Sequence, residues 1–234
     1  MSQLQRIAIA PSQLQNQQIL LTKEQQHYLG HVLRLREGDR FIAMDGKGKW
    51  WLAQLATEQA RVLETLTVET ELPVSITLMV ALPKGNAFDE VVRCCTELGV
   101  ACIAPVLSDR TLLKPSPQKL ERWRRIATEA AEQSERSFVP TILEPVAFNA
   151  VTANVTTQRY ICQARGEYPH LKNVINPAST EMIIATGPEG GWTEKEIENA
   201  IATGFQPVSL GRRILRAVTA PVVALTLISA GCEV

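Results

Sequence analysis

An alternation of apolar strands and helices from residue 74 onward is the feature that most constrains the fold of this chain. Val74–Leu82 is apolar for most of its length, as is typical of a strand buried on both faces. Asn86 can cap a helix whose apolar residues recur at helical spacing as far as Gly99, and Val100–Leu107 predicts the next strand. A strand, a helix and a strand in so short a stretch form a β-α-β unit, whose strands are parallel. We therefore expect an α/β domain built on a parallel sheet.

The same alternation continues to the end of the chain. Ser116-Pro117 predicts the start of a long helix that runs to about residue 137. Thr219 predicts the cap of a final helix, Ala220–Ala230. The later strands are expected at Tyr160–Ala164, Met182–Ala185 and Val208–Leu210.

The first 70 residues follow a different pattern, rich in short strands. Thr22 and Gln25 have the spacing of a capping box and predict one short helix. Four strands are expected around it, at Arg6–Ile9, Phe41–Met44, Trp50–Leu55 and Arg61–Val68. The polar stretch before Pro73 predicts a linker. We therefore expect a small β-barrel over residues 1–70 and the α/β domain over residues 74–234.

Composition excludes several classes of protein. The chain has 234 residues, 45% of them hydrophobic, with a formal net charge of +0, so binding to nucleic acid would depend on local basic patches. No signal peptide and no apolar run of membrane-spanning length is present. The five cysteines show no CxxC spacing, and His27 and His31 have no obvious third ligand. We expect a cytoplasmic protein with free thiols and no metal.

Two glycine-bearing turns each follow a predicted strand, Gly187–Gly191 and Leu210–Arg213. The first leads into a helix with a second capping box, Thr193 to Glu196, so its backbone N–H groups can hold a polar ligand. It lacks the Gly-Lys-Ser/Thr ending of a phosphate-binding loop, and Pro188 removes a donor that phosphate would use. A ligand site and a simple tight turn both remain open on these residues alone.

Arginines cluster near the second turn and along the long helix. Arg212, Arg213 and Arg216 have no compensating acid nearby in the sequence. If Ile214 and Leu215 point inward, their backbone can bond the edge of a purine while the arginines meet phosphate. One face of the long helix carries Arg122, Arg125, Glu129, Gln133 and Arg136. Each group also fits a solvated basic surface with helical ion pairs.

Four motifs occur in an order that resembles the ribosomal RNA small subunit methyltransferase E family. They are Arg93–Val100 (RCCTELGV), Glu129–Arg136 (EAAEQSER), Gly187–Gly191 (GPEGG) and Leu210–Arg216 (LGRRILR). The stretch His27–Leu35, followed by Gly38 and Asp39, is similar to the small N-terminal domain of that family. The resemblance thus covers nearly the whole chain.

The resemblance implies a PUA-like β-barrel that binds RNA, followed by a SPOUT-type methyltransferase domain with a C-terminal trefoil knot. It implies a homodimer that uses S-adenosylmethionine to methylate N3 of a uridine, uridine 1498 of 16S rRNA, in the assembled 30S subunit. Two alternatives stay open, a non-catalytic RNA-binding or ribosome-assembly protein on the same fold and a SPOUT methyltransferase acting on tRNA.

The resemblance also implies roles for individual residues. Arg216 or Arg136 would stabilise an anionic uracil, and Glu129 would be the general base. Val218 stands where the family usually has an acid, which puts a carboxylate role there in doubt. The expected cofactor-binding residues are Thr186, Gly187, Pro188, Glu189, Gly190, Gly191, Leu210, Gly211, Ile214, Leu215, Arg216 and Ala217. The expected RNA-binding residues are Arg6, Arg34, Arg36, Arg122, Arg125, Gln133, Arg212 and Arg213.

Overall fold

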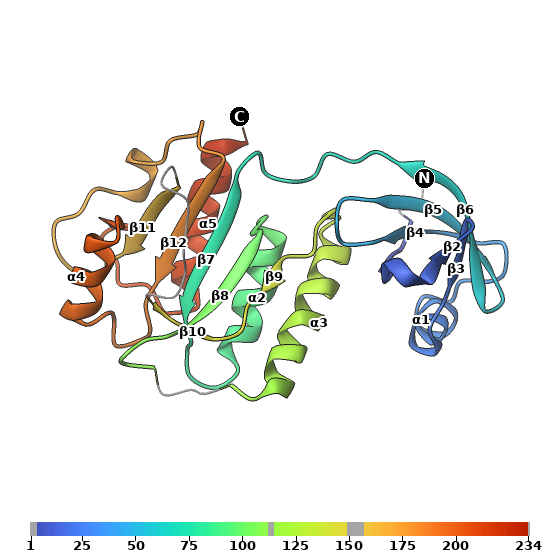
Figure 1. Cartoon of the computed structure of the whole chain (residues 1–234), viewed down its shortest axis with the longest axis horizontal. Helices are drawn as coiled ribbons and strands as arrows, with labels where there is room; N and C mark the ends of the chain where they lie inside the picture. The colour runs from blue at the N-terminus through green and yellow to red at the C-terminus, as the bar shows by residue number, and fades with distance from the viewer. Residues whose placement is uncertain (1–3, 112–114, 149–156, 234) are drawn as a thin grey trace. The chain divides into compact units, whose positions relative to one another are not determined.

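The computed structural model describes residues 4–111, 115–148 and 157–233, and the chain forms two compact units (Figure 1). The first unit contains Met1–Glu71 together with Ala131–Val139, and the second contains Leu72–Ala130 and Pro140–Val234. The division by sequence placed residues 131–139 entirely in the second domain. In the structure this segment belongs to the first unit, because Ala131 packs in its core with Met44 and Trp50 and Ser137 bonds to Glu71.

A six-stranded sheet forms the first unit, in the order β1-β4-β5-β6-β3-β2. Only β1 and β4 pair in parallel among these neighbours, and the register of β5 against β6 shifts between Leu52 and Ala53, a bulge that bends the sheet. The core is apolar, with Ile19, Leu29 and Phe41 fully buried. The strands are β1 Arg6–Ala8, β2 Leu14–Gln15, β3 Gln18–Leu20, β4 Arg40–Met44, β5 Trp50–Ala56 and β6 Gln59–Leu66, and the short 3-10 helix η1 is Pro11–Gln13.

The short helix α1, Lys23–His27, begins at the predicted capping box. Thr22 Oγ1 accepts from the backbone N–H of Gln25 at 3.2 Å, and the Gln25 side chain accepts from the Thr22 N–H at 2.9 Å. The chain continues as one π-helical turn, η2, Tyr28–Val32. This turn points Leu29 into the core of the first unit.

A parallel sheet forms the second unit, in the order β10-β8-β7-β12-β11-β13, with β9 also paired to β8. Each recorded pair of strands in it is parallel, which confirms the prediction from the β-α-β pattern. The strands are β7 Ser75–Ala81, β8 Cys102–Leu107, β9 Thr141–Ile142, β10 Val146–Ala147, β11 Gln158–Cys162, β12 Glu181–Thr186 and β13 Gln206–Val208.

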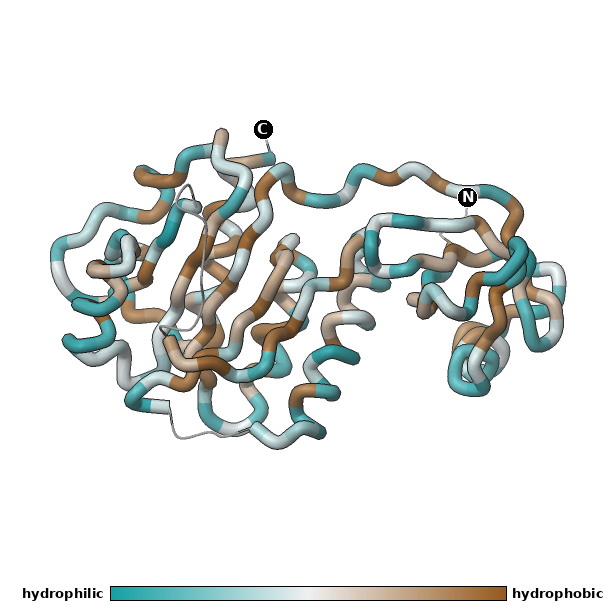
Figure 2. The backbone as a smooth tube through the Cα atoms, in the orientation of Figure 1, coloured by the Kyte–Doolittle hydropathy of each residue, from teal (hydrophilic) through white to brown (hydrophobic). Residues whose placement is uncertain are grey.

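Helices cover this sheet on both faces. Alternate residues of the strands, such as Met79 and Ile183, pack with Trp192, Ala200 and Phe205 on the side of α4. Helices α2 and α5 contact each other, and α5 contacts β12. Because both faces are covered, the central strands β7, β8 and β12 are apolar at most positions (Figure 2). The helices are α2 Ala87–Glu97, α3 Pro117–Gln133, α4 Glu194–Ala202 and α5 Thr219–Cys232, with the 3-10 turn η4 Leu171–Asn173.

Two predicted helix ends are wrong. Helix α3 stops at Gln133 rather than near residue 137, and Glu135 has a left-handed backbone with φ of 62°. Helix α5 already includes Thr219, which therefore does not cap it; the N-cap position is Val218, and no side-chain bond forms there. The backbone N–H groups of Thr219 and Ala220 donate to the carbonyl of Arg216 instead, at 2.9 and 3.0 Å.

Candidate functional site

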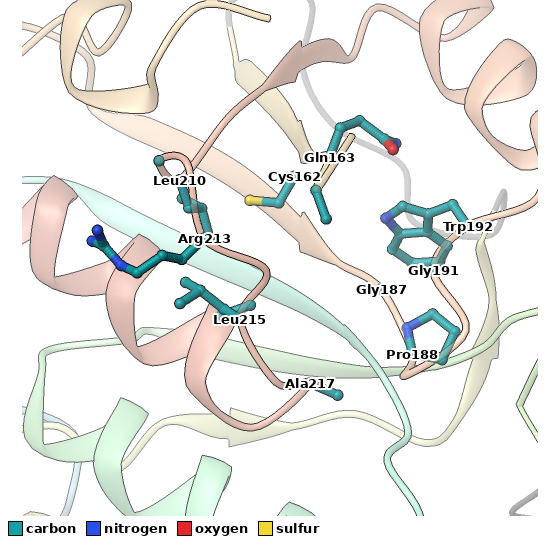
Figure 3. A pocket seen from close by; sticks show the side chains of 13 residues that line it. Cys162, Gln163, Gly187, Pro188, Gly191, Trp192, Leu210, Arg213, Leu215 and Ala217 are labelled. Carbon is teal, nitrogen blue, oxygen red and sulfur yellow. The ribbon is translucent and has the colours of Figure 1, made fainter. Parts of the chain in front are cut away.

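A pocket opens where three neighbouring strands of the second unit end. Strands β12, β11 and β13 are adjacent and parallel, so the loops that follow them meet at one edge of the sheet. The pocket has a volume of about 560 Å³, counted with its open mouth. Its lining residues follow these strands or begin α5 (Figure 3): Cys162, Gln163, Ala164, Gly187, Pro188, Gly191, Trp192, Leu210, Gly211, Arg213, Leu215, Ala217 and Ala220.

Bonds from two other loops hold the first glycine turn in place. Within the turn, the Gly191 N–H donates to the carbonyl of Pro188 at 2.9 Å, and Gly191 has a φ of 71°, which favours glycine. The Glu189 carboxylate accepts from the N–H of Lys84 at 3.0 Å, and the Arg110 guanidinium donates to the Gly190 carbonyl. Neither Glu189 nor Gly190 lines the pocket. In the structure these two residues anchor the turn.

Trp192 packs behind this turn and lies close to Gly187, so a side chain there would require the indole ring to shift by a few tenths of an ångström. A Cβ built on Gly187 would lie 3.2 Å from the indole Nε1. The Trp192 ring is 6% exposed and meets Phe148 edge-on, with centroids 5.0 Å apart. Within the described ranges, its Nε1 has no hydrogen-bond partner, and the same holds for the buried Nε2 of Gln163 and Oγ1 of Thr186. Three buried polar groups in or beside one pocket thus have no hydrogen-bond partner in the described residues.

The second turn is anchored to the loop before η4. The Leu171 N–H donates to the Ser209 carbonyl and the Ser209 N–H to the Pro169 carbonyl, each at 2.9 Å. Gly211 has a φ of 120°, and its N–H donates to Ser209 Oγ at 3.1 Å. Leu215 lines the pocket, as expected, whereas Ile214 does not meet the condition of pointing inward, since it is 65% exposed.

Seven of the twelve expected cofactor-binding residues line the pocket. They are Gly187, Pro188, Gly191, Leu210, Gly211, Leu215 and Ala217. The remaining five, outside that lining, are Thr186, Glu189, Gly190, Ile214 and Arg216. Sequence reasoning missed Cys162, Gln163 and Ala164, which it placed inside the expected strand Tyr160–Ala164, whereas β11 ends at Cys162. It also missed Trp192 and Ala220, and it placed Arg213 with the RNA-binding residues.

The wall formed by β11 is electrically neutral. Burial raises the pKa of the Cys162 thiol from its ordinary 9.0 to about 12, so the group stays protonated at neutral pH and is a poor nucleophile. Of the lining residues in the described part of the chain, Arg213 carries the formal charge. In Figure 3 its guanidinium points away from Trp192 and Pro188. The pocket therefore suits a ligand that brings its own hydrogen-bond acceptors.

The predicted stripe on α3 forms ion pairs and does not line the pocket. Arg122 donates to Asp89 through Nε at 2.8 Å, and Arg125 pairs with Glu129 at 3.6 Å. Arg122, Arg125, Glu129 and Gln133 are all exposed. These pairs agree with the solvated-face alternative, and the catalytic role of Glu129 stays a prediction.

Arg136 lies in a different environment, buried in the first unit with 4% of its surface exposed. Its Nε and one terminal nitrogen donate to one carboxylate oxygen of Glu71. The other Glu71 oxygen accepts from the N–H groups of Ser137 and Phe138 at 2.8 and 3.1 Å, and from Ser137 Oγ at 3.3 Å. We call Glu71, Arg136, Ser137 and Phe138 the Glu71 cluster. This burial favours a structural role for Arg136 over the expected contact with uracil.

The expected RNA-binding arginines also differ in exposure. Arg6 has an 11% exposed side chain that pairs with Glu135 at 2.8 Å and lies 5.2 Å from the centroid of the Trp50 ring. Arg34, Arg36, Arg212, Arg213 and Arg216 are exposed. The paired position of Arg6 favours a structural role, whereas the exposed arginines remain available to a polyanion.

His27 and His31 stack on each other, with ring centroids 4.7 Å apart. Within the described residues, no group of three or more His, Cys, Asp or Glu side chains has the arrangement of a metal site. No helix in the described part of the chain combines the length and apolar character needed to cross a membrane.

Comparison with known families matches both units. A family of RNA methyltransferase domains matches residues 70–229, and a family of RNA methyltransferase PUA domains matches residues 21–63. The ribosomal RNA small subunit methyltransferase E of Synechocystis sp. is 50% identical, over 97% of this chain and 78% of the relative. The Bacillus subtilis protein of the same name is 32% identical, over 89% of this chain and 88% of the relative.

Solved structures agree with these matches. The chain is similar to a ribosomal RNA small subunit methyltransferase E from Neisseria gonorrhoeae bound to S-adenosyl methionine, with a TM-score of 0.89, 32% identity and coverage of 97% and 98% of the two chains. It is also similar to a putative methyltransferase from Legionella pneumophila in complex with the cofactor SAM, with a TM-score of 0.86, 28% identity and coverage of 97% and 98%.

The expected fold class, a SPOUT-type α/β domain after a PUA-like N-terminal unit, is confirmed by the parallel sheet, the curled first sheet and these neighbours. Matches of this extent, in both units and at up to 50% identity, also confirm the resemblance of the four motifs. The chain belongs to the ribosomal RNA small subunit methyltransferase E family.

Proposed function

We propose that this protein transfers a methyl group from S-adenosylmethionine to N3 of a uridine in 16S rRNA within the assembled 30S subunit, with uridine 1498 as the expected target. The observation that carries the proposal is the pocket formed by two glycine turns at the carboxyl edge of β11, β12 and β13. Family membership and the named ligands of the Neisseria and Legionella proteins support it.

The pocket residues fit S-adenosylmethionine. Gly187 keeps the backbone accessible where a Cβ would meet Trp192, and two buried side-chain donors have no acceptor among the described residues. Gly187, Gly191, Leu210, Leu215 and Ala217 would hold the cofactor. When bound, it supplies a methyl group on a positively charged sulfur, which is already activated for transfer.

The protein's own task is to align the uracil and to favour loss of the N3 proton. Alignment replaces a bimolecular encounter by a positioned one, a gain of about 7–11 kcal/mol in the best-oriented reactions. As the proton leaves N3, negative charge develops on the uracil ring and its carbonyl oxygens. We propose that exposed Arg216, at the end of the second turn, stabilises this charge. We keep Glu129 as the proposed general base; Val218 lacks the carboxylate common at its position in the family.

The same proposal includes the assembly and the other partner surfaces. We propose a homodimer that works in the cytoplasm, where small subunits are assembled. The exposed Arg34 and Arg36 of the first unit, and Arg212 and Arg213 of the second turn, would contact RNA phosphates. Family membership supports this part of the proposal, and the exposure of these arginines supports their contact with RNA.

Transfer of labelled methyl groups from S-adenosylmethionine tests the proposal. The substrates are 30S particles that lack the modification, free 16S rRNA and bulk tRNA, and the modified base is then mapped. We expect transfer to 30S particles alone, at N3 of one uridine. Transfer to tRNA would favour a tRNA methyltransferase, and RNA binding without cofactor binding would favour an assembly protein. Either result would overturn the proposal.

A further inference from the structure

We propose that the side chains of Gln163 and Trp192 donate hydrogen bonds to the nucleoside part of the bound cofactor and so select for it. The inference rests on the proposed function, because it concerns the ligand of the same pocket. It goes further by naming two side-chain donors and the part of the ligand that they meet. Neither residue belongs to the motifs that carry the family resemblance.

The first step is the burial of the two donors. Trp192 is 6% exposed, and its Nε1 and the Nε2 of Gln163 are buried atoms without a hydrogen-bond partner in the described part of the chain. Folding removes such groups from water, and the loss is recovered only when an acceptor is supplied. Since both residues line the pocket, a bound ligand is in a position to supply that acceptor.

The second step is the direction of the groups. In Figure 3 the indole nitrogen of Trp192 lies on the side of the ring that faces the pocket and Cys162. Gly187 lies against this nitrogen, and any larger residue there would put a Cβ 3.2 Å from it. Gln163 follows β11, while Trp192 follows the turn after β12, so two neighbouring strands each bring one donor to the pocket.

The third step is the kind of acceptor. In the part of the chain that the structure describes, the lining residues include no acid, and Arg213, which carries their formal charge, points away from Trp192. A carboxylate bound beside Trp192 would therefore lack a cation, and burying an unpaired charge is costly. Ring nitrogens and ribose hydroxyls are neutral acceptors and suit two neutral donors. We therefore place adenosine, rather than the amino-acid end of the cofactor, beside Gln163 and Trp192.

Titration calorimetry with S-adenosylmethionine, combined with thermal unfolding of the cofactor-free protein, tests this role. Trp192→Phe keeps an aromatic ring against Phe148 but removes the N–H, and Gln163→Leu removes the amide. We expect each change to raise Kd by about three- to tenfold, the effect of one lost hydrogen bond. The unfolding midpoint without cofactor should stay unchanged or rise, because no protein bond is lost. Unchanged Kd values for both variants would overturn the inference.

Two other tryptophans provide matched controls. Trp50→Phe also removes a buried N–H without a partner in the described residues, but Trp50 lies outside the pocket lining, so Kd should not change. Trp123→Phe breaks a 3.0 Å bond to Asp89 and should lower the unfolding midpoint with no change in Kd. If Trp50→Phe weakens binding as much as Trp192→Phe does, the effect does not come from the pocket and the inference fails.

5′-Methylthioadenosine, which keeps the nucleoside but lacks the amino-acid end, locates the contact. The Trp192→Phe and Gln163→Leu variants should lose the same factor in affinity for it as for S-adenosylmethionine. If the loss disappears with this ligand, the donors face the carboxylate and the assignment to adenosine is wrong. If the unchanged protein binds no S-adenosylmethionine, the proposed function falls and this inference with it. Binding by the unchanged protein with unaffected variants overturns this inference alone.

Discussion

Arg136 and Arg216 both belong to family motifs, but their surroundings are opposite. Arg136 is buried in the first unit and donates to Glu71, whereas Arg216 is exposed after the second glycine turn of the second unit. In the Glu71 cluster the Glu71 carboxylate is the counter-charge of Arg136, and both side chains are largely buried. At the second turn no ion pair with Arg216 is recorded within the described residues. An arginine in a motif can therefore contribute to stability or to ligand binding. A buried acid beside it, as at Arg136, indicates a role in stability, whereas exposure without an acid, as at Arg216, indicates a role in binding.

The two regions also differ in how they satisfy hydrogen bonds. Each oxygen of Glu71 accepts more than one bond, from the Arg136 side chain and from the backbone and hydroxyl that follow it. At the pocket, by contrast, Gln163 and Trp192 keep buried donors without a partner in the described chain. A satisfied network stabilises one conformation, while unsatisfied donors lower stability until a ligand binds. The first region is built to hold the chain and the second to accept a ligand.

The largest expected effect comes from Arg136→Ala. The substitution leaves Glu71 partly buried without its cation, so we expect a loss of about 3–5 kcal/mol in the free energy of unfolding, measured in urea. Arg125→Ala is the control, because Arg125 and its partner Glu129 are exposed and 3.6 Å apart, and we expect a loss of no more than about 1 kcal/mol. If Arg136→Ala abolished methyl transfer at unchanged stability, the contrast between the two arginines would be broken.

Arg216→Ala should show the reverse pattern, with lost activity and unchanged stability. Removal of one group that stabilises developing charge typically lowers kcat by about 100- to 1000-fold. We expect this loss in methyl transfer to 30S particles, with an unfolding midpoint within about 1 °C of the unchanged protein, since an exposed side chain contributes little to stability. Arg93→Ala, at an exposed position of α2, is the control and should transfer at the normal rate. Near-normal transfer by Arg216→Ala would remove Arg216 from the mechanism.

Local patterns predicted much of the fold, and they succeeded where the signal lies within a few residues. Both capping boxes, at Thr22 and at Thr193, form with the expected partners. The parallel sheet followed from one β-α-β unit, because a short crossover leaves few other topologies. The helix ends at Gln133 and Thr219 were missed because Glu135 has a left-handed backbone just after α3 and because the Thr219 N–H donates to the Arg216 carbonyl with no side-chain cap at α5.

The site was predicted only in part, because the order of strands in a sheet is not a local property. The two glycine turns were identified from their own residues, and seven expected residues line the pocket. Gln163 was missed because nothing near it in the sequence shows that β11 lies between β12 and β13. Arg136 was assigned to catalysis because its partner Glu71 lies 65 positions away in the predicted linker. Both errors arose from contacts between residues far apart in the sequence, strand pairing for Gln163 and an ion pair for Arg136.

The first unit also contains both kinds of arginine, the exposed Arg34 and Arg36 and the paired Arg6, so the two roles can be compared within one unit. Replacing Arg34 and Arg36 together by Ala should lower the slope of log K against log salt concentration for rRNA binding by about 1.4, since each phosphate contact on single strands contributes about 0.7. Arg6→Ala should leave the slope unchanged and reduce stability, because Arg6 pairs with Glu135 and lies over Trp50. If the salt slope of rRNA binding changed with Arg6→Ala and not with the Arg34 and Arg36 substitutions, Arg6 would be the RNA contact and the two exposed arginines would not.

The smallest expected effect concerns the neutral wall of the pocket and its pH dependence. Burial raises the pKa of Cys162 from 9.0 to about 12, so between these values the unfolded chain releases a proton that the folded chain keeps. The folded state then binds more protons, and stability must fall as the pH rises from 9 toward 12. Cys162→Ala should make this fall less steep, with a difference on the order of 1 kcal/mol at pH 10.

Cys232→Ala is the matched control for this measurement. Its thiol pKa is also raised, first by burial and then by the charge of Glu233, but it lies near the end of α5, outside the pocket lining. We expect its removal to change the alkaline slope less than removal of Cys162 does, in urea titrations at pH 8, 9 and 10. Below pH 8 both variants should show the same pH dependence as the unchanged protein, because both thiols are then protonated in the folded and unfolded states. Equal effects of the two substitutions at pH 10 would mean that burial raises the pKa of the Cys162 thiol no more than that of the Cys232 thiol at the end of α5, and the neutral side of the pocket would then have no effect of its own on stability.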